Sequence, residues 1–253
     1  MNWNFLAPIF VYFLLISSPI LANEEARPLP DHKWTFEGAF GTFDLASLQK
    51  GFQIYKQVCS ACHSIKRIHF RNLSALGYNE AEIKAIASDY EVTDGPNDLG
   101  EMFTRKGTPA DAIPGPYAND KAARAANNGA LPPDLSLVVK ARKGGADYIF
   151  ALLTGYENPP AGKHIPQGMH YNPYFPGEQI AMTPPLSEGL ITHSDGTTPT
   201  VQQMAHDVVN FLTWAAEPEM VERKQMGLKV LFYLSIFTLL MYFVMRRVWA
   251  RVK

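Results

Sequence analysis

The chain has 253 residues, which is long for one ordinary domain and short for two, so one domain with additions is expected. With 47% hydrophobic, 12% aromatic and 19% charged residues, it is not disordered, collagen-like or a coiled coil, and two cysteines exclude a disulfide-rich scaffold. Residues 226–253 hold five basic and no acidic side chains, whereas residues 23–225 hold 18 basic and 24 acidic ones. The net negative charge of residues 23–225 argues against a nucleic-acid partner.

The N-terminus carries an export signal. Residues 5–16 (FLAPIFVYFLLI) are an almost unbroken apolar run, followed by a short segment that ends at Ala22. This pattern predicts a signal peptide over residues 1–22 with cleavage after Ala22, although no Lys or Arg precedes the run. A retained anchor is the alternative, but the run is shorter than the ~20 residues that a bilayer span needs.

Residues 23–225 are expected to form a mostly α-helical exported domain. Four segments show the three- and four-residue apolar spacing of helices, with capping or breaking residues at their ends. These are Asp44 up to the cysteine pair, 80–90 behind Asn79, about 147–154 before Gly155, and Thr198-Pro199 up to Pro218. Loops rich in Pro, Gly and Asn are expected at 107–133 and 155–199, and no strand-like alternation is sustained. Loops of that length in a compact domain usually wrap or bind something.

The two cysteines belong to the segment Cys59-Ser60-Ala61-Cys62-His63, which is the clearest functional motif of the chain. This C-x-x-C-H pattern is typical of covalent c-type haem attachment, because the two thiols can reach the vinyl groups on one porphyrin edge while the imidazole is directed at the iron. A structural zinc site would need four ligands, and a thioredoxin-like pair would need a βαβ context. A plain disulfide would leave His63 without a role. We therefore predict one covalent haem c with His63 as an iron ligand.

The iron needs a second ligand, or an open position if the protein is an enzyme. The candidates are the remaining histidines and the methionines Met102, Met169, Met182 and Met204. Met204 fits core packing on its helix face. Met182 precedes Pro184-Pro185, in a segment stiff enough to hold a thioether against iron, and Met169 is its rival. His/Met ligation raises the reduction potential and leaves no substrate position, which favours electron transfer.

The C-terminus carries a second membrane signal. Residues 226–245 (MGLKVLFYLSIFTLLMYFVM) are twenty residues with a single charge, Lys229, near the start, which predicts one transmembrane helix. The segment 246–253 that follows is basic, so the positive-inside rule places this tail in the cytoplasm and residues 23–225 on the opposite side. An export signal requires the same topology.

Four further segments follow the haem motif in order. They are ARAANNGALPPDLS (123–136), GGADYIFALLTGYENPP (144–160), HYNPYFPGEQIAMTPPL (170–186) and FLTWAAEPE (211–219). From roughly residue 32 to 253, the chain resembles the cytochrome c1 family, the haem-bearing subunits of the ubiquinol–cytochrome c reductase (bc1) complex. The resemblance implies a cytochrome-c-type haem domain with long loops and a C-terminal anchor.

The resemblance also implies roles for single residues. Met182 matches the family's I-x-M-x-P-P segment and would be the distal ligand rather than Met169. Arg124 would face a haem propionate, and Pro132-Pro133 would pack near the macrocycle. On the residues alone, an exposed charge in an Ala-rich stretch is the favoured interpretation of Arg124.

The same resemblance implies partners and location. The chain would take an electron from a Rieske iron–sulfur protein, pass it to cytochrome c, associate with cytochrome b, and perform no bond chemistry of its own. It would lie in a bacterial cytoplasmic membrane with the haem domain on the periplasmic side. The acidic stretch Asp89–Glu101 is either a solvated loop or a face that steers a basic partner.

Three other functions remain open at this point. One is a free-standing membrane-anchored c-type cytochrome that feeds an oxidase. The others are a haem enzyme such as a peroxidase and a haem-based ligand sensor. Both of the last two require an open position on the iron.

Overall fold

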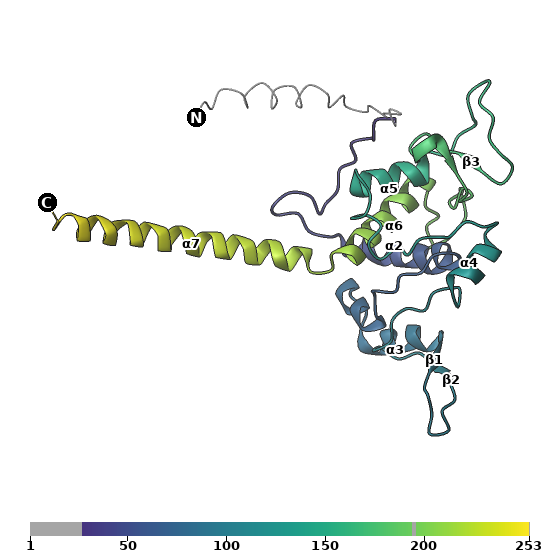
Figure 1. The fold of residues 1–253 in the computed structure, drawn as a ribbon, viewed down its shortest axis with the longest axis horizontal. Coiled ribbons are helices and arrows are strands. Elements are labelled where there is room, and N and C mark those ends of the chain that lie inside the picture. The colour runs from purple at the N-terminus through teal and green to yellow at the C-terminus, as the bar shows by residue number, and fades with distance from the viewer. Residues whose placement is uncertain (1–26, 194–195, 253) are drawn as a thin grey trace, which may run out of the picture.

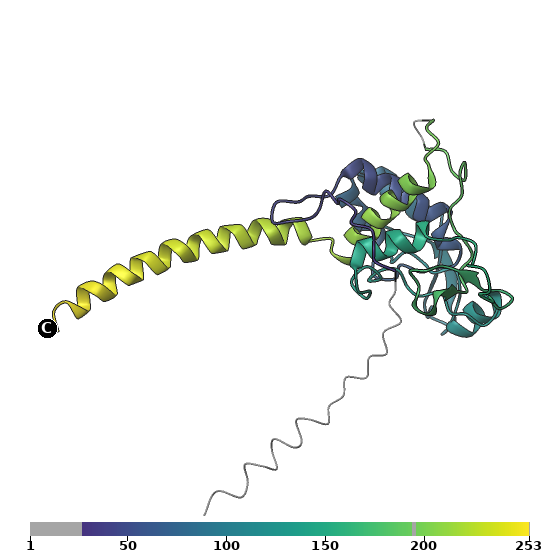
Figure 2. The same ribbon diagram turned by 90° about the horizontal axis from the view of Figure 1, so that it is seen from above.

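The computed structural model describes residues 27–193 and 196–252, so the predicted signal peptide 1–22 lies outside the described residues. A domain of short helices and long loops is followed by one long helix that extends away from it (Figures 1 and 2). The helices are α2 Leu45–Gln57, α3 Glu80–Ser88, α4 Asp120–Ala126, α5 Gly145–Thr154, α6 Val201–Ala216 and α7 Met220–Trp249, and the 3₁₀ turns are η1 Cys59–Ala61, η2 Phe70–Leu76 and η3 Pro176–Glu178. The predicted fold class, mostly α-helical with long loops and one C-terminal apolar helix, is confirmed.

The core forms where α2 packs against α6, with α5 also packed on α6. Phe211 of α6 is fully buried, and its ring lies 5.6 Å from that of Phe52 and 5.7 Å from that of Tyr55, both on α2. The two helices approach closely at Gly51, where a Cβ atom would lie 2.1 Å from the backbone oxygen of Asp207. Glycine at this position therefore allows the packing that holds the end of α2 in place.

Two predicted helix starts are correct, whereas one predicted start and one predicted end are wrong. The side chain of Asp44 accepts from the N–H of Ala46, and Asn79 caps α3 as predicted. The helix α6 begins at Val201 rather than at Thr198-Pro199, because Thr200 and Gln203 form a capping box that fixes its first turn. The helix α2 ends at Gln57, so the cysteines lie in the 3₁₀ turn that follows it instead of in the helix.

Two small antiparallel hairpins form where the sequence shows no sustained strand-like alternation. Strands β1 Glu91–Asp94 and β2 Phe103–Lys106 form one, and β3 His170–Tyr171 pairs with β4 Gln179–Ile180 in the other. Strands of this length are too short to show a sustained alternation. The predicted loop 107–133 also contains α4, and the second hairpin lies within the predicted loop 155–199.

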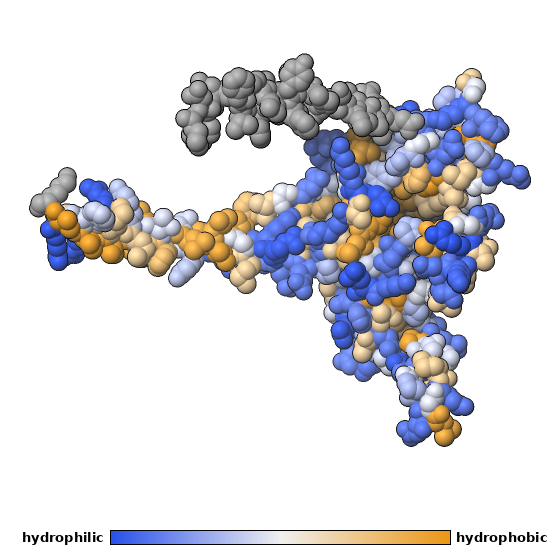
Figure 3. All heavy atoms as spheres, in the orientation of Figure 1, coloured by the Kyte–Doolittle hydropathy of each residue, from blue (hydrophilic) through white to orange (hydrophobic). Residues whose placement is uncertain are grey.

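The C-terminal helix α7 contains the predicted span 226–245 and begins six residues before it. In the part of the chain that the structure describes, it is the one helix long and apolar enough to cross a membrane, with a mean hydropathy of 2.0 and none of that stretch buried. Figure 3 shows apolar side chains along this helix, clear of the haem-motif domain, and hydrophilic ones at its far end.

Candidate haem site

The C-x-x-C-H motif is a tight turn attached to the buried end of α2. The N–H of Val58 donates to Ile54 at the end of the helix, and the N–H groups of Cys62 and His63 both donate to the carbonyl of Cys59, at 3.1 and 2.9 Å. Both cysteines are free thiols; Cys59 packs against the core and Cys62 is exposed. Burial raises the pKa of the Cys59 thiol to about 12, so this thiol stays protonated at neutral pH.

The imidazole of His63 is held in one tautomer. Its Nδ1 atom lies 2.8 Å from the carbonyl oxygen of Pro133. A carbonyl can only accept, so Nδ1 carries the proton and Nε2 carries a lone pair. Burial lowers the pKa of His63 and outweighs the opposing effect of this hydrogen bond, which keeps the ring neutral. A neutral imidazole with one nitrogen held by a carbonyl is the usual state of a metal-binding histidine.

Further bonds tie the segment 63–67 to the segment 133–136. The carboxylate of Asp134 accepts from the hydroxyl of Ser64 at 2.7 Å and from the N–H of Lys66 at 2.9 Å. The N–H of Leu135 donates to the carbonyl of Ser64 at 2.8 Å. Burial disfavours ionisation of Asp134, but the hydrogen bonds that it accepts outweigh burial and lower its pKa. The two segments therefore form one rigid support for His63.

The two methionine candidates both lie beside Tyr156. The hydroxyl of Tyr156 donates to the backbone carbonyl of Met182 at 3.0 Å, in the segment that follows β4. Met169 lines a cavity of about 480 Å³ together with Tyr156 and Pro184. Both methionines are half-buried. The structure thus places Met169 and Met182 in the same region, and the assignment of Met182 as the iron ligand remains a prediction.

Arg124 lies in α4 and is exposed. Its Nη1 atom donates to the carbonyl of Gly129 at 2.9 Å, and its own carbonyl accepts from the N–H of Gly129 at 2.8 Å. The second of these bonds closes the turn after α4, where Gly129 has a φ of 87°. One donated bond uses a fraction of the donors that a guanidinium carries, so Arg124 can still meet an anion such as a propionate. That role remains a prediction.

These residues fit a haem better than a bare metal ion. Within 27–193 and 196–252, no group of three or more His, Cys, Asp or Glu side chains could hold a metal ion. A haem needs fewer protein ligands, because the porphyrin nitrogens supply the rest. Two free thiols, one imidazole with an available nitrogen and a methionine thioether from either candidate form a set that fits a haem c.

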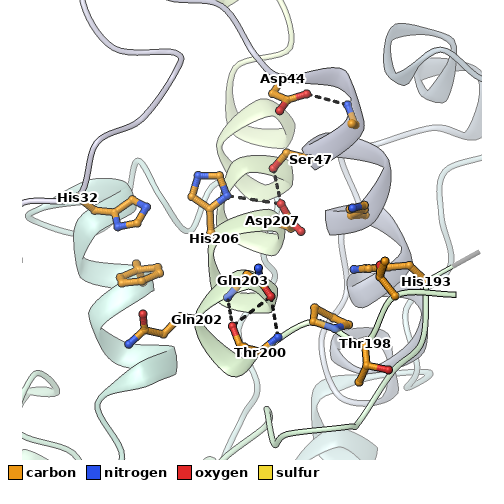
Figure 4. A pocket seen from close by; sticks show the side chains of 15 residues that line it. His32, Asp44, Ser47, His193, Thr198, Thr200, Gln202, Gln203, His206 and Asp207 are labelled. Atoms are coloured by element: carbon orange, nitrogen blue, oxygen red, sulfur yellow. Dashed lines mark hydrogen bonds and ion pairs between the residues drawn. The ribbon is translucent and has the colours of Figure 1, made fainter. Parts of the chain in front are cut away.

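A cavity of about 900 Å³ lies away from the predicted haem ligands, between the start of α2 and the start of α6. Figure 4 shows Ser47 and His206 directed at Asp207, which accepts from the Ser47 hydroxyl at 2.6 Å. The predicted haem residues do not line this cavity. Cavity size is therefore no guide to the haem site in this fold.

The acidic stretch Asp89–Glu101 is partly neutralised. Asp89 forms an ion pair with Lys56 at 2.9 Å, and Asp94 pairs with Arg105 across the first hairpin. Asp98 and Glu101 lie exposed on the connection between β1 and β2. The prediction of a loop is therefore wrong for Glu91–Asp94, which form β1, and the partner-steering role remains a prediction for the connection.

Comparison with known proteins decides the family, since the model of the Cytochrome C1 family matches residues 34–252. The chain belongs to the cytochrome C1 family. An Arabidopsis thaliana relative named "Cytochrome c1 2, heme protein, mitochondrial" is 51% identical over 95% of this chain and 79% of its own length. "Cytochrome c1" of Rhodospirillum rubrum is 48% identical over 95% and 94%. In Candida albicans, the "Cytochrome b-c1 complex catalytic subunit, mitochondrial" is 51% identical over 94% and 83%.

The family predicted from four sequence segments is thus confirmed. Two residues that the structure makes prominent, Asp134 and Tyr156, lie inside those segments, yet nothing in their residue type indicated a role. Their partners are far away in the sequence, and a pairing over such a separation leaves no local pattern.

Proposed function

We propose that this chain is the haem-bearing electron carrier of a quinol–cytochrome c oxidoreductase of the bc1 type. Its membership of the cytochrome C1 family supports this, as do relatives named as haem proteins and as a subunit of a cytochrome b-c1 complex. The observation that carries the proposal is the bond from His63 Nδ1 to Pro133, because it leaves Nε2 available beside two free thiols.

The proposed haem site uses two covalent attachments and two protein ligands on the iron. Cys59 and Cys62 would bind one haem c covalently through thioethers, and His63 Nε2 and the Met182 sulfur would bind its iron. A haem bound in this way supplies one-electron chemistry at its iron. The chain contributes the orientation of His63 through Pro133 and the position of the Met182 backbone through Tyr156. Arg124 would pair with a propionate and favour its ionised form.

Two protein ligands on the iron would separate this function from two of its alternatives. A peroxidase or a ligand sensor needs an open iron position, and reduced iron in either would bind carbon monoxide at neutral pH. A free-standing carrier that feeds an oxidase would share the ligands but not the complex. Co-purification with cytochrome b and a Rieske iron–sulfur protein therefore distinguishes the carrier from the proposed subunit.

The proposed topology places the haem domain outside a bacterial cytoplasmic membrane. The apolar run 5–16 supports export of residues 23–225, and α7 supports a single span, 226–245. Arg246 and Arg247 in the last turn of α7 favour a cytoplasmic tail, 246–253. The electron would pass outside the membrane from a Rieske protein to cytochrome c.

The acceptor would be a basic cytochrome c, steered by the acidic domain over about a Debye length, ~8–10 Å at physiological salt. Because Asp94 is paired with Arg105, Asp98 and Glu101 are the candidate contacts. Replacing both with their amides should slow association at low salt and leave the haem spectrum unchanged. An unchanged association rate at low salt would place the docking face elsewhere.

The central test of the proposal uses the purified full chain. Haem should stay with the denatured chain on a gel, and reduced protein should resist carbon monoxide at neutral pH. Replacing both Cys59 and Cys62 with Ser should release the haem on denaturation. Haem that leaves the unsubstituted chain, or ready carbon monoxide binding, would overturn the proposal.

A further inference from the structure

A tight loop close to the start of α7 displays an exposed phenylalanine. We call residues 35–42 the Phe40 loop. The N–H of Thr42 donates to the carbonyl of Thr35 at 3.0 Å and closes the loop at its base. At its tip, residues 37–40 are exposed, and Phe40 has 82% of its surface in solvent. Few large apolar side chains of this domain are as exposed, so the position requires an explanation.

The Phe40 loop has a defined conformation and is anchored in the hydrophobic core. Trp34 and Phe36, at its base, are buried and stack at 5.4 Å, and the indole N–H of Trp34 donates to Asp147 at 2.6 Å. At Gly41, a Cβ atom would lie 2.0 Å from the backbone oxygen of Glu37, so this turn requires glycine. Phe40 is therefore held out by a defined backbone.

The loop is fastened to α7 just before the predicted span. The Nζ atom of Lys224 donates to the carbonyl of Phe36 at 2.6 Å and to that of Gly41 at 3.4 Å. A helix rises about 1.5 Å per residue, so Lys224 lies about 3 Å along the axis from Met226, where the apolar run begins. In both ribbon views the purple loop extends from the domain alongside the first turns of α7 (Figures 1 and 2).

We infer that the Phe40 loop is a second membrane contact, which places Phe40 in the outer lipid–water interface beside α7. This inference rests on the membrane anchoring by α7 in the proposed function. The polar headgroup region is about 5–7 Å deep on each side of a bilayer, so a side chain fastened at the level of Lys224 lies within it. Two contacts, one helix and one loop, restrict the tilt of the haem domain relative to the membrane where one contact would not.

The lipid interface is favoured over a protein occupant by continuity with α7. Lys224, which holds the loop, lies in α7 two residues before the apolar run begins, so the loop lies at the level where that run meets the bilayer surface. Glu37, on the same tip, limits the depth, because its carboxylate must stay among water and headgroups while the Phe40 ring enters. The contact is therefore shallow and interfacial.

The test uses spin labels on the full haem-loaded chain in phosphatidylcholine nanodiscs. Phe40→Cys and Leu99→Cys form a matched pair, because both side chains are 82% exposed and Leu99 lies in the hairpin connection, away from α7. Leu234→Cys in α7 reports on the bilayer core. The unsubstituted chain, labelled in parallel, measures any signal from Cys59 and Cys62. Electron paramagnetic resonance then gives the collision rates with oxygen, which concentrates in lipid, and with a water-soluble nickel chelate.

We expect the ratio of oxygen to nickel collisions at Phe40 to exceed that at Leu99 several-fold and to stay below that at Leu234. A ratio equal to that at Leu99 would place the loop in water and overturn the inference. Low rates with both reagents would show contact with protein, and would also overturn it. If Leu234 itself gave the aqueous ratio, the proposed anchor would fail and the inference with it, whereas a lipid ratio at Leu234 alone would remove only the inference.

Discussion

The segment that carries His63 and the segment that carries Met182 are held by different kinds of structure. On the His63 side, hydrogen bonds from a side chain, a ring and backbone groups join 63–67 to 133–136. On the Met182 side, one hydroxyl from Tyr156 reaches the backbone, and the prolines that follow supply stiffness. Changes on the His63 side should therefore lower folding stability. Changes on the Met182 side should alter the reduction potential and ligand binding of the haem iron while leaving the fold intact.

The largest effect is expected from Met182→Leu. Leucine keeps the apolar volume but cannot bind iron, so the reduction potential should fall by on the order of 0.1 V, within the range that axial ligands span. Covalent haem should remain, since the cysteines are unchanged, and the reduced iron should now bind carbon monoxide. A redox titration and a carbon monoxide difference spectrum measure both effects.

Met169→Leu is the matched control for that prediction. It changes the same residue type beside the same tyrosine, and it should leave both the potential and carbon monoxide binding unchanged. If Met169→Leu produced the fall in potential and Met182→Leu did not, the two methionines would exchange roles.

On the His63 side, Asp134→Asn should destabilise the protein by about 2 kcal/mol, the scale of hydrogen bonds to a charged group. The pKa of Asp134 is lowered in the folded state, so its contribution is present above its unfolded pKa of about 3.9 and is lost as pH falls through the folded value. The stability difference between wild type and variant should therefore shrink in acid. Chemical denaturation at neutral and acid pH checks this.

The control for Asp134 is Asp31→Asn, whose side chain is 86% exposed. This change should alter the free energy of unfolding by less than about 0.5 kcal/mol. Equal effects from the two variants would mean that the hydrogen bonds of Asp134 contribute no more to stability than an exposed carboxylate does.

A smaller effect is expected from Tyr156→Phe, which removes the single bond to the Met182 carbonyl. The loss of about 1 kcal/mol should raise the fraction of methionine-dissociated haem about fivefold, seen as faster carbon monoxide binding with little change in folding stability. Tyr242→Phe, in α7, is the control and should change neither quantity. A large loss of folding stability in Tyr156→Phe would show that the two sides are held alike.

Arg124→Ala should have the smallest effect. Removal of a cation near a propionate favours the more positive, oxidised state, so the potential should fall, but by less than in Met182→Leu. Lys121→Ala removes an exposed cation from the same helix and should leave the potential unchanged. If both variants lowered the potential equally, the fall would come from the loss of any nearby positive charge. The proposed contact of Arg124 with a propionate would then be wrong.

Local patterns predicted the parts of the fold that depend on neighbours in the chain. The caps at Asp44 and Asn79 and the apolar run of α7 are local, and the structure has them. The start of α6 was predicted too early because Pro199 suggested a first helical position, while the capping box at Thr200 decides the start.

Local sequence patterns do not predict contacts between segments that are distant in the chain. The carbonyl of Pro133 that fixes His63 lies 70 residues away, and Tyr156 lies 26 residues from Met182. A backbone carbonyl has no sequence signature, since every residue carries one. The family resemblance named the residues that would touch the haem, but the groups that hold those residues became visible only in the fold.

The most direct test of the proposed His63 and Met182 ligation is X-ray absorption at the iron of the purified full chain. We expect one axial sulfur and one axial nitrogen in the wild type, and loss of the sulfur in Met182→Leu with the covalent haem retained. Two axial nitrogens, or an iron without any sulfur ligand in the wild type, would contradict this ligation and the electron-carrier function built on it.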